Sequence, residues 1–142
     1  MKLVAVSQRV DVVADRPERR DALDQRLIQW LARAGYAPVP VPNQILGPCQ
    51  VQGPQLTEAL TNWLDIVGPS AVLLSGGNDI GECPERDETE NTLLQWSEVN
   101  LRPVLGICRG MQMLGVRAGA ELTSVAGHVR SRHTLVSDVL QG

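Results

Sequence analysis

The sequence is poor in aromatic residues and in cysteine, and both shortages narrow what the protein can be. Its 142 residues include no phenylalanine, and the aromatic side chains are three tryptophans and one tyrosine. The core is therefore expected to be aliphatic, as in proteins whose Val, Leu and Ile strands are buried between helices. Three cysteines, Cys49, Cys83 and Cys108, are too few and too scattered for a disulfide framework or a zinc site. We expect no bound metal and a reduced, cytoplasmic setting.

The sequence also has no long basic run and no long apolar run. The net charge is −3, and without clustered Lys and Arg a nucleic-acid partner has no electrostatic support. No apolar stretch approaches the roughly 20 residues that a membrane-spanning helix needs. Ordinary proportions of hydrophobic (43%) and charged (20%) residues favour a single globular domain over residues 1–142. We therefore expect neither nucleic acid nor a membrane as a partner.

Short apolar runs alternate with segments of helical periodicity along most of the chain. Strands are predicted at Lys2–Ser7, Ala37–Val41, Ala71–Leu74 and Val104–Ile107, with another over Val129–Val136. Helices are predicted at Arg19–Ala34, Gln55–Val67, Asp87–Asn100 and Met111–Ala118. Asp15 is predicted to cap the first helix, and the prolines at 38, 40 and 42 predict an edge position or a short length for the second strand. The alternation indicates an α/β fold with a mostly parallel sheet and helices on both faces.

The turn between the fourth strand and the fourth helix carries a candidate nucleophile. Gly106–Gly110 reads G-x-C-x-G, the cysteine form of the nucleophile elbow, in which the central side chain projects above the sheet. The start of a helix directly after Cys108 favours the thiolate form, and the amide of Arg109 can receive an oxyanion. The alternative is a buried structural cysteine in an ordinary strand–helix turn. We interpret Cys108 as a nucleophile.

A pair of glycines and two histidines are further candidates for the same site. Gly76–Gly77 follows the third strand, and in parallel sheets ligands gather at the carboxyl ends of the strands. Adjacent glycines there can turn an amide toward the cleft, although a plain Gly-Gly turn is the simpler alternative. A cysteine nucleophile also needs a general base, commonly histidine. His128 and His133 are the two histidines of the sequence, and a surface position among arginines is an equal alternative for both.

The motifs around Cys108 resemble a known superfamily. Gly106–Gln112 resembles the G-[IV]-C-R-G-x-Q nucleophile segment of the class I glutamine amidotransferases, and it looks most like the γ-glutamyl hydrolase branch. Leu74–Asp79 matches the L-S-G-G-x-D oxyanion strand of that branch. Arg86–Asp87, with Glu90 three residues on, matches its R-D-x-x-E helix start. The resemblance spans nearly the whole chain, and the cysteine motif is its specific part.

Two weaker matches extend this resemblance. Residues 127–129 with 132–133 resemble a later strand that borders the substrate pocket. The γ-glutamyl-γ-aminobutyrate hydrolases are one example of the γ-glutamyl hydrolase branch. The segment Ser7–Val10 is similar to the corresponding segment of another subgroup, which hydrolyses γ-glutamyl-CDP-amidate during capsule phosphoramidate synthesis.

The resemblance implies a fold and a set of roles. The fold would be flavodoxin-like, and no metal or organic cofactor would be required. Cys108 would attack the γ-glutamyl carbonyl of a small-molecule substrate and form a thioester, with the oxyanion held by the backbone amides of Gly77 and Arg109. The glutamyl group would contact Gln112, Gly76 and His133.

One element of the family pattern is absent from these residues. The family carries its catalytic His and Glu in an H-x-E motif near the C-terminus, and the 142 residues contain no such motif. We therefore expect a domain that lacks its C-terminal part, with an inactive, naturally shortened relative as the alternative. A truncated sheet would expose an edge and favour a homodimer.

The sequence thus favours hydrolysis of a γ-glutamyl amide, with a leaving group that it does not identify. Two alternatives remain open. One is a glutamine amidotransferase subunit that delivers ammonia to a synthase. The other is an inactive or redox-sensing binding module that uses Cys108 without a base.

Overall fold

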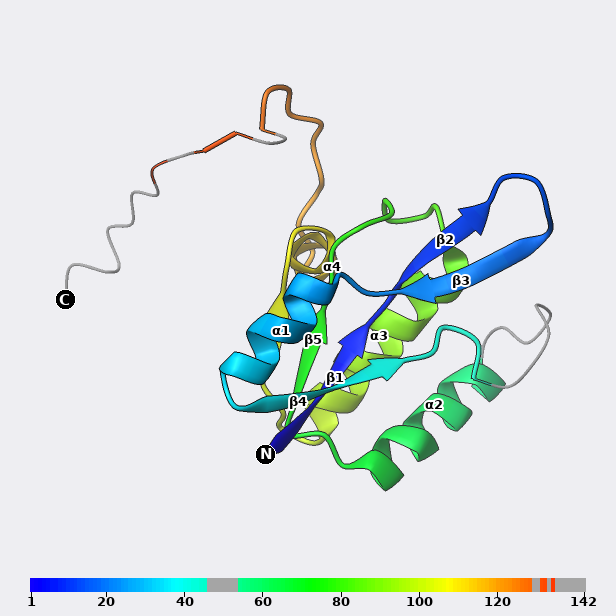
Figure 1. Cartoon of the computed structure of the whole chain (residues 1–142), viewed down its shortest axis with the longest axis vertical. Helices are drawn as coiled ribbons and strands as arrows, with labels where there is room; N and C mark the ends of the chain where they lie inside the picture. Colours follow the sequence, from blue (N-terminus) through cyan, green and yellow to red (C-terminus); the bar gives the residue numbers. More distant parts are fainter. Residues whose placement is uncertain (46–53, 129–130, 133, 135–142) are drawn as a thin grey trace.

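A four-stranded parallel sheet with helices on both faces forms the body of the protein (Figure 1). The computed structural model describes residues 1–45, 54–128, 131–132 and 134. The strands of the sheet are β1 (Lys2–Ser7), β4 (Tyr36–Val41), β5 (Ala71–Leu74) and β6 (Val104–Gly106). The helices are α1 (Gln25–Arg33), α2 (Pro54–Val67), α3 (Pro84–Val99) and α4 (Arg109–Arg117). The predicted α/β class with a mostly parallel sheet is confirmed.

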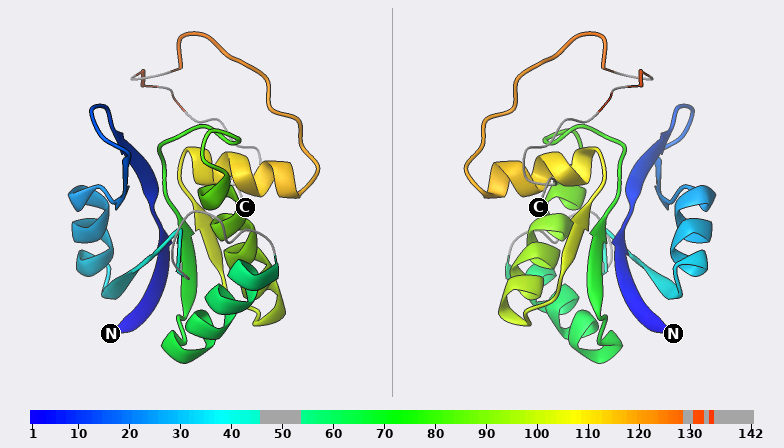
Figure 2. Two further views of the ribbon diagram at one scale, coloured as in Figure 1. Left: turned by 90° about the vertical axis from the view of Figure 1, so that its right-hand side faces the viewer. Right: turned by 90° about the vertical axis from the view of Figure 1, so that its left-hand side faces the viewer.

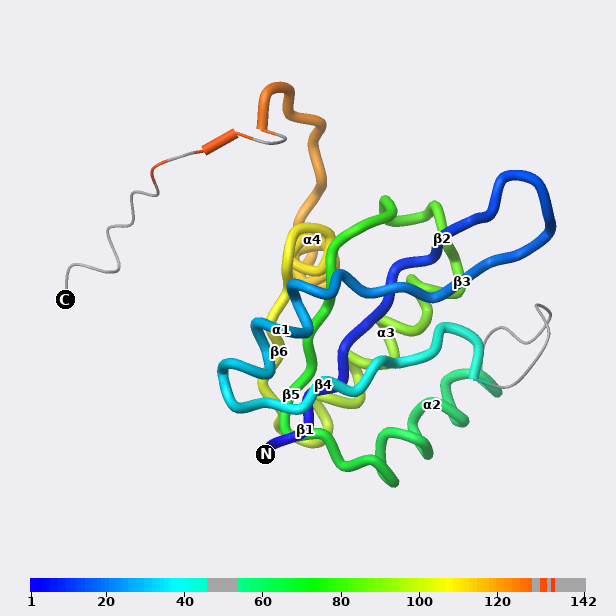
Figure 3. The backbone as a smooth tube through the Cα atoms, in the orientation of Figure 1, coloured from blue at the N-terminus to red at the C-terminus, as the bar shows by residue number. Residues whose placement is uncertain are grey.

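The strand order is β4-β1-β5-β6, and every neighbouring pair is parallel. β4 pairs with β1 alone, so the edge position that its prolines predicted is confirmed. β5 and β6 lie side by side, and β6 leads directly into α4 (Figure 3). The carboxyl ends of β5 and β6, where the Gly-Gly and cysteine motifs follow, therefore meet at the same end of the sheet.

Different helices cover the two faces of the sheet (Figure 2). Each face buries its own apolar cluster. Val4 and Val6 of β1 pack with Leu31 of α1 on one face. Ala5, between them in sequence, faces the larger cluster on the other side, which α2, α3 and α4 cover. This cluster consists of Ala5, Val41, Leu60, Leu64, Val72, Leu74, Leu93, Leu94, Trp96 and Met113. The period of two along β1 matches a strand buried on both sides.

The segment before α1 differs from the sequence prediction. Residues Arg9–Val13 and Glu18–Ala22 form an antiparallel hairpin, β2 and β3, which projects beyond the end of the sheet (Figure 1). The prediction of a helix from Arg19, capped by Asp15, is therefore wrong. α1 is capped instead by Asp24, whose side chain accepts a hydrogen bond of 2.8 Å from the Arg26 amide. The apolar stripe begins only at Leu23, so the charged residues before it had no buried face to hold in a helix.

The start of α3 also differs from the prediction. α3 begins three residues before the predicted Asp87, with Pro84 in its first turn, where the missing amide hydrogen costs nothing. Residues 120–128 run as irregular chain after α4. Most of the strand predicted over Val129–Val136 lies outside the described residues. Among the described residues, no helix combines the length and the apolar character needed to cross a bilayer.

Leu64 and Ile66 of α2 test the assigned packing face. Leu64 is fully buried and Ile66 is 86% exposed. Leu64→Ala is expected to lower the free energy of unfolding by about 2–5 kcal/mol because it leaves a cavity. Ile66→Ala is expected to change it by no more than about 0.5 kcal/mol. Urea denaturation followed by circular dichroism measures both, and equal losses would contradict the orientation of α2.

Candidate active site

Cys108 lies at a strained turn between β6 and α4. Its backbone has a φ of 52° and a ψ of −108°, a conformation that residues with a Cβ rarely adopt. Such strain costs on the order of 1–3 kcal/mol and persists where the surrounding structure holds it. The residue is exposed at the carboxyl end of the sheet. The sharp turn predicted from the sequence is confirmed, whereas the nucleophilic role stays a prediction.

Close packing explains the two glycines of the turn. A Cβ on Gly110 would lie 2.2 Å from the carbonyl oxygen of Leu74, at the end of β5. A Cβ on Gly106 would lie 2.6 Å from the backbone of Gly110. Both distances are far below van der Waals contact, so only glycine lets the start of α4 sit against the ends of β5 and β6. The G-x-C-x-G spacing is therefore fixed by packing around Cys108.

The loop after β5 lies directly beside the turn. A Cβ on Gly76 would be 3.5 Å from the Cβ of Cys108, so this glycine faces the cysteine. Gly77 has a φ of 88°, and Asn78 has a φ of 56°. A Cβ on Gly77 would lie 3.0 Å from Cδ of Arg9, which extends from β2. The structure thus brings together Gly76, Gly77 and Cys108, which the sequence had placed on two separate strands.

A buried arginine of α3 holds this loop by its carbonyl groups. Nη2 of Arg86 donates to the carbonyl oxygens of Ser75 at 2.8 Å and of Gly76 at 3.1 Å. Nη1 donates to the carbonyl oxygen of Gly77 and, at 3.0 Å, to Oδ1 of Asn78. Burial lowers the pKa of the Arg86 guanidinium, while the neighbouring carboxylate of Glu90 opposes that shift. One planar cation therefore fixes three successive peptide groups.

Glu90 connects this arginine to the cysteine turn. Its Oε1 accepts hydrogen bonds from Nε of Arg86 at 3.2 Å and from Oγ of Ser7 at 2.8 Å. Its Oε2 pairs with Nη1 of Arg109, the residue after Cys108, and Nη2 of Arg109 pairs with Asp87. The Arg109 side chain is 2% exposed, so it points into the protein and not toward the cleft. We call Arg86, Asp87, Glu90 and Arg109 the buried ion network.

The spacing of Arg86 and Glu90 in the sequence is a signal for this network. Arg86 and Glu90 are four residues apart and therefore lie on the same side of α3. Both have fully buried side chains. The motif match identified these residues by resemblance without giving them a role. A helix with weak apolar periodicity and an Arg-x-x-x-Glu pair is the pattern that could have indicated a buried polar face.

The hairpin missed from the sequence also contacts the site. The amide of Val10 donates to Oδ1 of Asn78 at 2.8 Å, and Nδ2 of Asn78 donates to the Val10 carbonyl at 3.0 Å. These two bonds dock β2 onto the loop after β5. They account for the position of Arg9 against Gly77.

A cavity of about 300 Å³ opens beside the loop and the turn. It is large enough for a small molecule. Its lining combines an apolar wall with one cationic and one anionic side chain, and consists of Arg9, Ala22, Leu23, Asp24, Leu27, Ser75, Gly76, Gly77 and Ile107. Ile107 directly precedes Cys108 and Gly76 faces it, so the cavity lies next to the cysteine turn, although Cys108 itself is not one of its lining residues.

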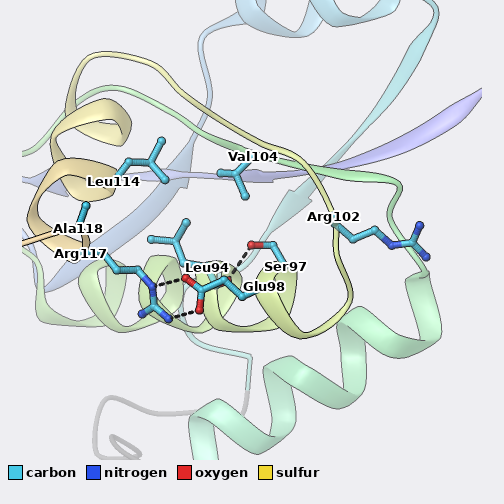
Figure 4. Close-up of a pocket in the computed structure, with 8 residues that line it drawn as sticks. All are labelled: Leu94, Ser97, Glu98, Arg102, Val104, Leu114, Arg117 and Ala118. Atoms are coloured by element: carbon cyan, nitrogen blue, oxygen red, sulfur yellow. Dashed lines mark hydrogen bonds and ion pairs between the residues drawn. The ribbon is translucent and has the colours of Figure 1, made fainter.

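A second cavity of about 310 Å³ lies between α3 and α4 (Figure 4). Its lining includes Arg117 and Ala118, at the end of α4 remote from Cys108, and a bidentate ion pair joins Arg117 to Glu98 at 2.8 and 2.9 Å. None of the residues predicted to form the active site lines it. The cavity beside Gly76 and Gly77 is therefore the candidate active site.

The remaining predicted site residues are placed only in part. Gln112 is half-buried on α4. Its backbone N–H donates to the Cys108 carbonyl at 3.1 Å, so it lies one turn beyond the cysteine. His128 is exposed in the irregular segment after α4. His133 and Cys49 lie outside the described residues. Within the described part of the chain, no group of three or more His, Cys, Asp or Glu side chains could hold a metal ion.

Comparison with known protein families identifies the chain. A family model for peptidase C26 matches residues 3–138. The chain belongs to the peptidase C26 family. This family is class I glutamine amidotransferase-like and of the γ-glutamyl hydrolase type, which implies a hydrolase- or amidotransferase-like enzyme. A comparison with curated proteins found no match.

Gly110 and Gly115, both on α4, form a matched pair for the packing of the turn. Gly110→Ala is expected to prevent the native fold or to destabilise it by several kcal/mol, because its Cβ would overlap the Leu74 carbonyl. A Cβ on Gly115 would meet only Cβ of Ala120, at 3.7 Å. Gly115→Ala is therefore expected to leave stability unchanged or to raise it by up to about 1 kcal/mol. Thermal unfolding measures both, and a stable Gly110→Ala protein would contradict the close approach.

The two described cysteines should differ sharply in reactivity. Cys83 is buried, and burial raises the pKa of its thiol, so little thiolate forms there at neutral pH. In a Cys49→Ser background, iodoacetamide at pH 7.5 is expected to modify native protein once, at Cys108. Cys83 should react only in denaturant. Intact mass and peptide mapping give the result, and equal labelling of both residues in the native state would contradict the structure.

Proposed function

We propose that this protein hydrolyses a γ-glutamyl amide through a thioester on Cys108. The observation that carries the proposal is the position of Cys108, which is exposed at a strained turn and faces Gly76 of the neighbouring loop. Membership of the peptidase C26 family supports the same chemistry.

The proposed reaction has two halves. Sγ of Cys108 attacks the γ-carbonyl carbon, and the carbonyl oxygen becomes an oxyanion next to the amides of Gly77 and Arg109. The C–N bond then breaks, and the amine leaves with the proton that the thiol gave up. Water attacks the resulting thioester, which releases glutamate and restores the thiol. Arg109 is the first residue of α4, and amides of the first turn have no partner within the helix and carry partial positive charge.

The cavity beside Cys108 supports a substrate with a charged group near the scissile bond. Arg9 lines this cavity next to Gly77, and a guanidinium suits an anionic leaving group such as the phosphoramidate of γ-glutamyl-CDP-amidate. Gln112 and Gly76, and His133 outside the described residues, are the proposed contacts of the glutamyl group. On this basis we propose γ-glutamyl-CDP-amidate as the preferred substrate.

A glutamine-like diazo-ketone tests the proposal. The Cys108 thiol would displace dinitrogen from the probe and form a thioether, which adds one mass adduct. Glutamate is expected to slow this labelling severalfold because it occupies the γ-glutamyl site. Cys108→Ser should abolish the adduct, and Cys83→Ala, a matched cysteine outside the cavity, should retain it.

The outcomes separate the alternatives. Labelling that glutamate does not slow, together with equal reaction toward simple oxidants and alkylators, would support a redox-sensing module and contradict a γ-glutamyl pocket. Labelling that requires denaturation would contradict both. Release of glutamate from γ-glutamyl-CDP-amidate, followed by mass spectrometry, distinguishes this substrate from other γ-glutamyl amides.

A further inference from the structure

The carbonyl groups of three successive peptides converge on one buried guanidinium. Ser75, Gly76 and Gly77 all direct their carbonyl oxygens at the two terminal nitrogens of Arg86. This convergence is unusual because carbonyls at the end of a strand ordinarily point to alternate sides. The left-handed φ of Gly77 allows the chain to turn all three the same way.

The direction of the carbonyls sets the direction of the amides. No described peptide bond is cis, and in a planar trans peptide the N–H points opposite to the C=O. The carbonyl of Gly76 and the amide of Gly77 belong to the same peptide group. Because that carbonyl is directed at Arg86, the Gly77 amide is directed away from Arg86.

The side of the loop away from Arg86 is the side of the cavity. Arg86 belongs to α3, which covers one face of the sheet, and α1 covers the other (Figure 2). The cavity is lined by Leu23 and Leu27, from the α1 side, and by Gly76 and Gly77 of the loop. This arrangement directs the Gly77 amide toward the cavity, which lies next to the cysteine turn.

We infer that Arg86 is a positioning residue, which turns the Gly77 amide toward an oxyanion on Cys108 by binding the carbonyls behind it. This inference rests on the proposed function and adds to it the group that orients one oxyanion donor. Arg86 is fully buried and is not among the residues that line the cavity. It acts through the backbone of Ser75, Gly76 and Gly77, which it binds from behind.

Glu90 extends the same device to the second donor. Its two oxygens bind Arg86 and Arg109, so the loop after β5 and the start of α4 are fixed to one carboxylate. The amide of Arg109 belongs to the residue whose side chain Glu90 holds. Glu90 thereby links the two segments that carry the proposed oxyanion donors, in keeping with preorganised stabilisation of a transition state.

The test compares two reactions of the same thiol. Acylation by p-nitrophenyl acetate passes through an oxyanion and expels p-nitrophenolate, a leaving group that needs no proton. Alkylation by iodoacetamide displaces iodide from a carbon atom and forms no oxyanion. Arg86→Lys keeps a cation beside Glu90 but has no fork to bind three carbonyls.

Arg86→Lys is expected to slow acylation of Cys108 roughly 10- to 100-fold. Its alkylation rate should stay within about twofold of the wild-type rate. A merely structural role would slow or accelerate both reactions together. The matched control is Glu98→Gln, which breaks the exposed ion pair between the same two helices and should alter neither rate.

Equal acylation by the Arg86→Lys and wild-type proteins would overturn the inference and leave the proposed function standing. Slowed acylation in the variant, with diazo-ketone labelling that glutamate does not slow, would support the inference and remove the γ-glutamyl assignment. Wild-type protein that is not acylated at all would contradict both.

A measurement on the wild-type protein keeps the inference testable if the variant does not fold. Butyraldehyde adds to the Cys108 thiol as a hemithioacetal: the C–S bond forms, the carbonyl π bond opens, and the thiol proton passes to the former carbonyl oxygen, which takes the position of the oxyanion. The amide resonances of Gly77 and Arg109 are expected to shift downfield in ¹H–¹⁵N spectra, while those of Gly68 and Gly119, remote glycines with positive φ, should not. An unmoved Gly77 resonance would refute the assigned direction of its amide.

Discussion

The carboxylate of Glu90 lies between two buried guanidinium groups, and the arrangement at the carboxyl end of the sheet depends on it. Through Arg86 it holds the loop after β5, and through Arg109 it holds the start of α4. Ser7 adds a third link, because its hydroxyl donates to Glu90 and accepts from the Ser75 amide at 2.9 Å. The carboxyl ends of β1, β5 and β6 are therefore all held, directly or through one neighbour, by the Glu90 side chain.

Such a network is a poor source of stability. Removing two arginines and a glutamate from water costs several kcal/mol for each ion, and mutual attraction returns this only with good geometry. Apolar residues of similar volume would pack α3 against the sheet at least as well. The network does provide direction, since a guanidinium with several donors can orient peptide groups that apolar contacts leave free to rotate. Its location between the two candidate oxyanion donors matches that use.

The sequence predicted the framework better than the details of the site. Continuous apolar runs such as Ala71–Leu74 identify buried strands, and the glycines around Cys108 identify a turn that only glycine can accommodate. The hairpin β2–β3 was missed because its charged strands bury little and depend on docking through Asn78. The burial of Arg109 was equally out of reach, since its partners Asp87 and Glu90 are about 20 residues away and meet it only after the sheet has formed.

The link between Ser7 and Glu90 spans 83 positions of the chain. A nascent polypeptide grows by about 5–20 residues per second, so roughly 4–17 s separate the synthesis of these two partners. Until residues 71–74 have been made, β1 lacks its neighbour β5, and until Glu90 has been made, the Ser7 hydroxyl lacks the carboxylate that it binds. Among the described strands, β1 is thus synthesised before the others and is among the last to gain all of its partners.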